Sequence, residues 1–419
     1  MKRLICALLL AAMLPTLAAC GSVYTNYREM EQLLVLQTMG LDRAAEGGIT
    51  LSLASSAASG RRKSPVRMKL TGATIASAVE RAQNYSFEES LFFSHMDALM
   101  LGEDYAHRGL ADCVDFVTQS PRLRVDIPIY IVKGTTAEKA VLEVGDETAG
   151  ISEILRGVSE FYDTRGGGNV YTLSDFTRDT LRHGSALVCA LELTPAAQTA
   201  AAEDSSADTP DTEAPSTDTA ADADASADSE PTPADTPRLT AAGAGYAIMQ
   251  DMKLVGYIDT DNSLGISFLK NTVRQTDVTV EDARGNAVTL EINQGRCDIT
   301  PRFTTDGALS RIDIAARVGA TVLEADGTAS FADSAYMDYL TGELESLVSQ
   351  KISAILRLAR SLRADFIGLG AAVEQASPES WARLERPFYE LLPALEVRIS
   401  VTGQITHSND TRRTVYNHE

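Results

Sequence analysis

The chain has 419 residues, and its 58 acidic and 37 basic residues give a formal net charge of −21. This excess of acid argues against nucleic acid as a partner, because phosphate binding requires a basic face. A hydrophobic content of 44% and a charged content of 23% exclude a wholly disordered or fibrous chain and predict a sizeable core, spread over about two to four domains.

The N-terminus has the pattern of a secretory signal over residues 1–19. Lys2 and Arg3 precede an apolar run, residues 4–14, that is too short to span a membrane. The signal ends in Leu-Ala-Ala directly before Cys20, the pattern of a bacterial lipobox. We therefore predict that Cys20 carries a diacylglyceryl group that anchors the protein to the outer face of a membrane. The alternative is an ordinary cleaved signal with an incidental cysteine.

The next part of the chain is predicted to begin with a β-hairpin. Short apolar runs at residues 33–41 and 49–54 flank a turn at Gly47 and Gly48. Apolar residues at helical spacing then predict a helix over residues 75–82.

A strand, a helix and a second strand are predicted at residues 91–101, 105–118 and 125–132. This order is typical of a βαβ unit with a parallel pair of strands. Residues 136–180 are predicted to be mainly helical, with an interruption at residues 166–168, which are all glycine. A phosphate-binding loop would need a preceding strand and a following Gly-Lys-Ser/Thr, so we interpret these glycines as a flexible connection.

Residues 195–237 hold eleven acidic residues and no Lys or Arg. The remainder is mostly Ala, Ser, Thr and Pro, without large apolar side chains to bury. Such a composition does not offset the entropy cost of ordering, so we predict a disordered linker or an inserted loop.

The segment after the acidic stretch is predicted to be rich in strands. Asp251 and Met252 separate two apolar runs and predict a second hairpin. Four further alternating runs follow, at residues 276–280, 287–292, 297–303 and 310–318. In the last run apolar and charged residues alternate, so we expect an antiparallel sheet with one solvated face.

The C-terminal region is predicted to combine helices with a strand. Apolar residues at i, i+3 and i+4 predict a long helix over residues 336–363. Ser377 followed by Pro378 is a good start for a second helix, and residues 395–405 alternate as in a strand.

The predicted fold class is mixed α+β, in several domains. We expect an N-terminal α/β domain at residues 20–194, the acidic linker at 195–237, a β-rich middle domain at 238–330 and an α+β domain with the long helix at 331–419.

Residue types that carry catalysis or bind metals form no recognised pattern. The five histidines are scattered, and His95 is interpreted as a core or edge residue of a strand. Cys113, Cys189 and Cys297 lack C-x-x-C spacing and are interpreted as buried thiols, with one disulfide and an odd thiol as the alternative. We predict no catalytic residue, no metal and no cofactor, although a carboxylate pair stays open because acidic residues are numerous.

Several short stretches, in order along the chain, resemble one known family. They lie at residues 28–33, 39–42, 93–103, 109–110, 115–116, 120–124, 245–247, 253–257 and 365–370, followed by Trp381. This ordered set resembles the Ger(x)C family, the C-subunit lipoproteins of bacterial spore germinant receptors. The chain departs from the family in carrying residues 21–23, Gly-Ser-Val, where Trp-Asp is common, Ile367 in place of a Phe, and the acidic insertion.

The resemblance implies a lipoprotein of three domains without enzymatic activity. It implies assembly with two integral membrane proteins, the A and B receptor subunits, in the spore inner membrane, and a role in nutrient-triggered germination. Asp365, Gly368 and Gly370 are then expected to form a structural turn after the long helix, since Gly permits backbone angles that other residues resist. Trp381 is expected to be a core or interface anchor.

The alternative functions are a solute-binding lipoprotein and an extracytoplasmic hydrolase. A solute-binding lipoprotein of a transporter would have two similar α/β lobes about a cleft. The predicted α/β front and antiparallel rear of this chain are dissimilar, which disfavours it. An extracytoplasmic hydrolase has no motif to support it.

Overall fold

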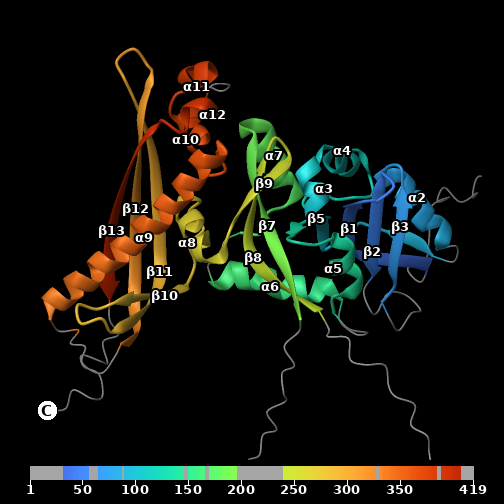
Figure 1. Cartoon of the computed structure of the whole chain (residues 1–419), viewed down its shortest axis with the longest axis horizontal. Coiled ribbons are helices and arrows are strands. Elements are labelled where there is room, and N and C mark those ends of the chain that lie inside the picture. The colour runs from blue at the N-terminus through green and yellow to red at the C-terminus, as the bar shows by residue number, and fades with distance from the viewer. Residues whose placement is uncertain are drawn as a thin grey trace, which may run out of the picture.

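The computed structural model describes residues 32–55, 65–86, 89–145, 150–165, 169–195, 239–325, 331, 333–384 and 388–406. The predicted signal, Cys20, the glycine run at residues 166–168 and residues 196–237 of the acidic segment lie outside these ranges. The described chain forms two sheets with helices on and between them (Figure 1). The fold is thus mixed α and β, as predicted.

A nine-stranded sheet makes up one half of the molecule (Figure 1). Its strand order is β3-β2-β1-β5-β6-β7-β8-β9, and β4 pairs with the start of β1. The four central strands β1, β5, β6 and β7 run parallel, and the outer strands join them antiparallel. The strands are β1 Leu33–Arg43, β2 Ile49–Ser55, β3 Arg67–Gly72, β4 Ser90–Phe92, β5 Ala98–Gly102, β6 Ile129–Val132, β7 Ser185–Pro195, β8 Leu239–Gln250 and β9 Lys253–Ile258.

Helices cover both faces of this sheet, which explains why its central strands are apolar throughout. In β5, Leu99 and Leu101 contribute to the core on one face, and Ala98 and Met100 to the core on the other. The first face carries α2 Ile75–Tyr85, α3 Glu103–Arg108, α4 Ala111–Gln119 and α7 Leu173–His183. The second carries α5 Ala137–Glu143 and α6 Ile151–Arg165.

A four-stranded sheet of order β10-β11-β12-β13 makes up the other half (Figure 1). Its strands are β10 Thr276–Glu281, β11 Ala287–Phe303, β12 Leu309–Ala325 and β13 Glu396–Thr406. The long helix α9, Ser334–Leu362, crosses the sheet and buries a stripe of residues four apart, such as Leu340, Leu344 and Val348. Ile312, Ile314 and Ala316 of β12 face this helix side, and the residues between them face outward, as predicted.

Short helices connect the two halves. Helix α8, Thr260–Leu269, follows the first sheet and packs against α9. Helices α10 Leu369–Ala376, α11 Pro378–Leu384 and α12 Phe388–Leu391 lie at the upper side of the junction in Figure 1. In the described part of the chain, no helix is both long and apolar enough to cross a membrane.

Both predicted hairpins are present. Strands β1 and β2 pair antiparallel around Gly47 and Gly48, which have φ of 90° and 87°. Strands β8 and β9 pair around Asp251 and Met252, which both have positive φ, at 48° and 63°. Two adjacent residues with positive φ are the geometry of a tight hairpin turn.

The prediction of a single strand over residues 91–101 is wrong, because this segment forms two strands, β4 and β5, with a turn between them. In the turn, the Met96 N–H donates to the Phe93 carbonyl, and the Asp97 N–H donates to Gln37 of β1. His95 lies in this turn and is exposed, so it is neither a core residue nor part of a strand.

The helix predicted over residues 105–118 is also interrupted. Gly109 has a φ of 119°, which ends α3, and the next N–H, of Leu110, donates to Met252 in the β8–β9 turn. A contact distant in sequence therefore sets the break. The strand predicted over residues 125–132 is shorter, as β6 begins at Ile129, but the predicted parallel pairing of this βαβ unit is present between β5 and β6.

The sheets divide the chain differently from the predicted domains. Strands β7 and β8 pair antiparallel from Ser185 opposite Gln250 to Pro195 opposite Leu239, so the acidic segment joins two neighbouring strands of one sheet. Strands β8 and β9 therefore lie in one sheet with β1 to β7, not in a middle domain over 238–330. Strand β13 pairs with β12, so the predicted middle and C-terminal domains share one sheet. Composition does not reveal such pairing.

Candidate functional site

The family-like turn at Asp365 caps a helix at the junction of the two halves. Its carboxylate accepts hydrogen bonds from Gly368 N at 3.0 Å, Leu369 N at 2.8 Å and Gly370 N at 2.6 Å. These are backbone donors at the start of α10, which no preceding helical turn could satisfy. Burial raises the pKa of the Asp365 carboxyl, while the three backbone donors and the nearby Lys270 act in the opposite direction. The predicted structural turn is therefore present.

Two glycines make this turn sterically allowed. Gly368 has a φ of 97°, which L side chains rarely adopt. A Cβ on Gly370 would lie 2.7 Å from the Trp381 ring and 3.0 Å from Asp365 Oδ2. The Trp381 ring and the Asp365 carboxylate, which caps α10, thus occupy the space that a side chain at position 370 would need.

The same turn contacts the end of the nine-stranded sheet. The Asp365 N–H donates to Ser185 Oγ at 3.0 Å, and Ser185 is the first residue of β7. Further along α10, the Glu374 carboxylate lies 3.1 Å from both Arg182 Nε and His183 Nε2 at the end of α7. The hydrogen bond from Arg182, followed by that from His183, holds the pKa of Glu374 below its usual range.

Trp381 belongs to both the core and the interface between the halves. Its side chain is buried, and its ring centroid lies 5.4 Å from that of Phe388 and 5.9 Å from that of His183. Edge-on ring contacts at these distances are favourable beyond the area they bury. The two roles expected for Trp381 are therefore combined, and we call this group of Ser185, His183, Asp365, Glu374 and Trp381 the Asp365 junction.

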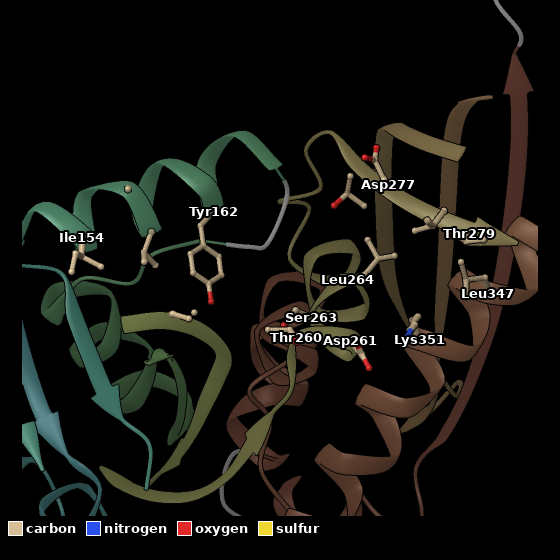
Figure 2. A pocket seen from close by; sticks show the side chains of 16 residues that line it. Ile154, Tyr162, Thr260, Asp261, Ser263, Leu264, Asp277, Thr279, Leu347 and Lys351 are labelled. Carbon is tan, nitrogen blue, oxygen red and sulfur yellow. The ribbon is translucent and has the colours of Figure 1, made fainter. Parts of the chain in front are cut away.

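A cavity of about 890 Å³ lies between the two halves (Figure 2). Helix α6 and strand β8 supply one wall, including Ile154, Val158 and Tyr162. Helix α8, strand β10 and helix α9 supply the other, including Asp261 and Lys351. The volume lies within the range of about 300–1,000 Å³ that is typical of small-molecule sites.

A smaller cavity of about 390 Å³ lies at the far end of the nine-stranded sheet. It is lined by residues of α2, by Phe93 and Phe116, and by residues 120–123 after α4. Family-like stretches that are separate in sequence therefore meet at this place.

None of the three described cysteines lines either cavity. Cys113, Cys189 and Cys297 are free and buried, so the predicted buried thiols are confirmed and the alternative with a disulfide is wrong. Burial raises the pKa of Cys189 to about 12 and that of Cys297 to about 11. Among the described residues, no three His, Cys, Asp or Glu side chains are grouped as for a metal ion.

Comparisons with known proteins bear on both halves. The model of the spore germination protein N-terminal domain matches residues 26–193, and that of the spore germination B3/GerAC-like C-terminal region matches residues 244–409. The chain belongs to the Ger(x)C family. This family comprises the C subunits of spore germinant receptors, so the chain has a role in spore germination.

One solved structure supports the fold. The crystal structure of the GerBC protein matches with a TM-score of 0.51 at 12% sequence identity, covering 88% of this chain and 96% of that chain. No curated protein sequence matches the chain. The first family model ends before the acidic segment, and the second begins after it. The sheet, by contrast, includes the strands on both sides of this segment, because β7 pairs with β8.

Part of this site is predictable from the sequence. Asp365, Gly368, Gly370 and Trp381 stand out by the family resemblance, but Ser185 and the other residues that meet them from the first half do not. The larger cavity was missed entirely, because its lining comes from five separated elements. One feature of the sequence could have pointed to this cavity. Gly157 stands within a helical pattern, where Ala would be favoured.

Proposed function

We propose that the protein is a lipid-anchored, non-catalytic subunit of a spore germinant receptor. Diacylglyceryl on Cys20 holds it on the outer face of the cytoplasmic membrane, which in spores is the inner membrane. There it acts with the integral membrane A and B subunits in nutrient-triggered germination. Anchoring confines the body to the membrane surface and raises its effective concentration beside these partners, so weak contacts suffice.

The observation that carries the proposal is the ordered match of both family models to one chain whose residues 1–20 have the pattern of a signal and a lipobox. At the Asp365 junction, Asp365 and Ser185 are buried, and the hydrogen bond between them holds the two halves together.

Membrane fractionation tests the anchor. We expect Cys20→Ala to move the protein from the membrane fraction to the soluble fraction, and mass spectrometry of the wild-type N-terminal peptide to show a diacylglyceryl cysteine. Cys6→Ala is the matched control, because it removes a thiol within the predicted signal and leaves the lipobox intact. An unmodified Cys20 in membrane-bound protein would disprove the anchor.

Germination assays test the receptor role. Deletion of the gene is expected to abolish the response to one nutrient while vegetative growth stays normal, and expression of the wild-type gene is expected to restore it. Co-purification from solubilised spore membranes should recover the A and B subunits with the wild-type protein. Normal germination to every nutrient in a strain that lacks related C subunits would contradict the proposal.

The alternative, a solute-binding lipoprotein of a transporter, receives no support from the architecture. Its expected lobes would be alike, whereas the nine-stranded mixed sheet and the four-stranded sheet differ in size and topology. The cavity between the halves nevertheless has features of a ligand site.

A further inference from the structure

The cavity between the two halves has an apolar body. Ile154 and Val158 of α6 line one side, and Leu264 of α8, Val278 of β10 and Leu347 of α9 line the other. Figure 2 shows α6 and Tyr162 opposite α8 and α9 across the space. A ligand in this position would contact both halves at once and bury apolar surface against each.

Two glycines shape the α6 side of the cavity. Gly157 lies in α6, and a Cβ there would meet no atom within 4 Å, so its missing side chain leaves the space open. Glycine within a helix lowers the stability of a protein by about 0.5–1 kcal/mol relative to alanine. Gly157 carries this loss at the wall of the cavity. A Cβ on Gly243 would lie 2.7 Å from Tyr162 Oη, so that glycine lets the phenol ring lie across β8.

Charged groups of both signs line the wall formed by α8, β10 and α9. Lys351 is half-buried, and within the described part of the chain its ammonium has no carboxylate within 4.0 Å. Asp261 and Asp277 line the same cavity and likewise have no ion-pair partner among the described residues (Figure 2). Lys351 is half-buried, whereas Asp261 and Asp277 are exposed at the mouth of the cavity, so all three charged groups are accessible to a ligand.

We propose that this cavity binds a zwitterionic small molecule with an apolar body, of the class of short apolar peptides. Lys351 binds the carboxylate of the ligand, one or both of the two aspartates bind its ammonium group, and the apolar walls hold its side chains. A purely anionic amphiphile would be repelled by the aspartates, and a purely cationic one would leave Lys351 unpaired. Binding here does not depend on the receptor role proposed above.

Calorimetry on the full chain in detergent tests the charge pairing, with the dipeptide Leu-Leu as the probe. Leu-Leu-amide lacks the carboxylate, and N-acetyl-Leu-Leu lacks the ammonium group. We expect Lys351→Met to weaken Leu-Leu binding roughly tenfold, as for the loss of one charge-assisted hydrogen bond, and not to weaken Leu-Leu-amide binding. Arg357→Met, at an exposed position of the same helix, is the matched control and should bind like wild type.

Filling the cavity tests the location. Gly157→Phe places a ring in the open space and is expected to abolish Leu-Leu binding, while Gly342→Phe, at an exposed helical glycine of α9 with equal free space, should not. Unchanged circular dichroism and melting temperature would show that both variants fold. The proposal is overturned if Leu-Leu does not bind at millimolar concentration, if Lys351→Met weakens both peptides equally, or if Gly157→Phe binds normally. None of these outcomes bears on germination or on the anchor.

Discussion

Asp365 and Ser185 meet across the junction of the two halves although 180 residues separate them. The Asp365 N–H donates to Ser185 Oγ at 3.0 Å, and both residues are buried. The Asp365 carboxylate meanwhile caps α10, so a single residue fixes the end of the long helix, the start of the next helix and their position on β7. The single tryptophan, Trp381, lies beside this contact and makes its fluorescence a direct probe of the junction.

Loss of the Ser185 hydroxyl should destabilise the fold. Ser185→Ala leaves the buried Asp365 N–H without an acceptor, and we expect a loss of about 1–3 kcal/mol in the free energy of unfolding. Urea denaturation followed by Trp381 fluorescence measures it. Ser361→Ala, at an exposed position of α9, is the control and should change the stability little. Equal stability of the two variants would show that the junction contact contributes nothing.

Gly370 should not tolerate a side chain. In Gly370→Ala the new Cβ would lie 2.7 Å from the Trp381 ring, and overpacking of this kind costs about 1–3 kcal/mol. Gly342→Ala is the opposite case, because its Cβ meets nothing within 4 Å in the exposed middle of α9, and there we expect a gain of about 0.5–1 kcal/mol. Thermal unfolding should therefore move in opposite directions for the two variants.

The Glu374 contact should make stability depend on pH. Hydrogen bonds from Arg182 and His183 lower the pKa of Glu374 from its ordinary value of 4.5. A carboxyl whose pKa is lower in the folded state stabilises the fold above the unfolded pKa, and this contribution disappears as the pH falls through the folded pKa. We therefore expect Glu374→Gln to lower stability at pH 6 by up to about 1 kcal/mol, with the difference from wild type shrinking as the pH falls below 4.5.

Urea midpoints measured from pH 6 down to pH 3 test this dependence. Glu379→Gln is the matched control, because the Glu379 side chain is 89% exposed and lies 3.9 Å from Arg383. Its difference from wild type should stay small at every pH. A constant difference between Glu374→Gln and wild type across the range would exclude the linkage.

Local patterns in the sequence predicted most single elements correctly. The stripe of apolar residues in α9, the turn at Asp251 and Met252, and Ser377 before α11 each depend on neighbours within a few residues. The interruption of the predicted strand at His95 and that of the predicted helix at Gly109 were not predicted. The first depends on a contact with β1, and the second on a contact with the β8–β9 turn. Helix α10 was missed because eight residues are too few for a clear period, and the Asp365 cap defines its start.

Relations between distant elements account for the remaining errors. The composition of residues 195–237 predicts a linker, but only the pairing of β7 with β8 shows that it joins neighbouring strands. Strand β13 was predicted as a strand, yet its parallel pairing with β12 follows from the path of α9 across the sheet. The charged residues of the cavity were unremarkable in the sequence, because Asp261 and Lys351 become neighbours of one space only when α8 packs on α9.

The three described cysteines should resist modification until the protein unfolds. Cys113, Cys189 and Cys297 are each at most 3% exposed, and burial raises the pKa of every one of them, so little thiolate is available at neutral pH. We expect iodoacetamide at pH 8 to label none of the three in the native protein and all three in 6 M guanidinium, as read from peptide mass spectrometry. Cys297, with its pKa raised to about 11, should be the first to react as denaturant is added. Rapid labelling of any of them in the native state would mean that its surrounding core opens readily.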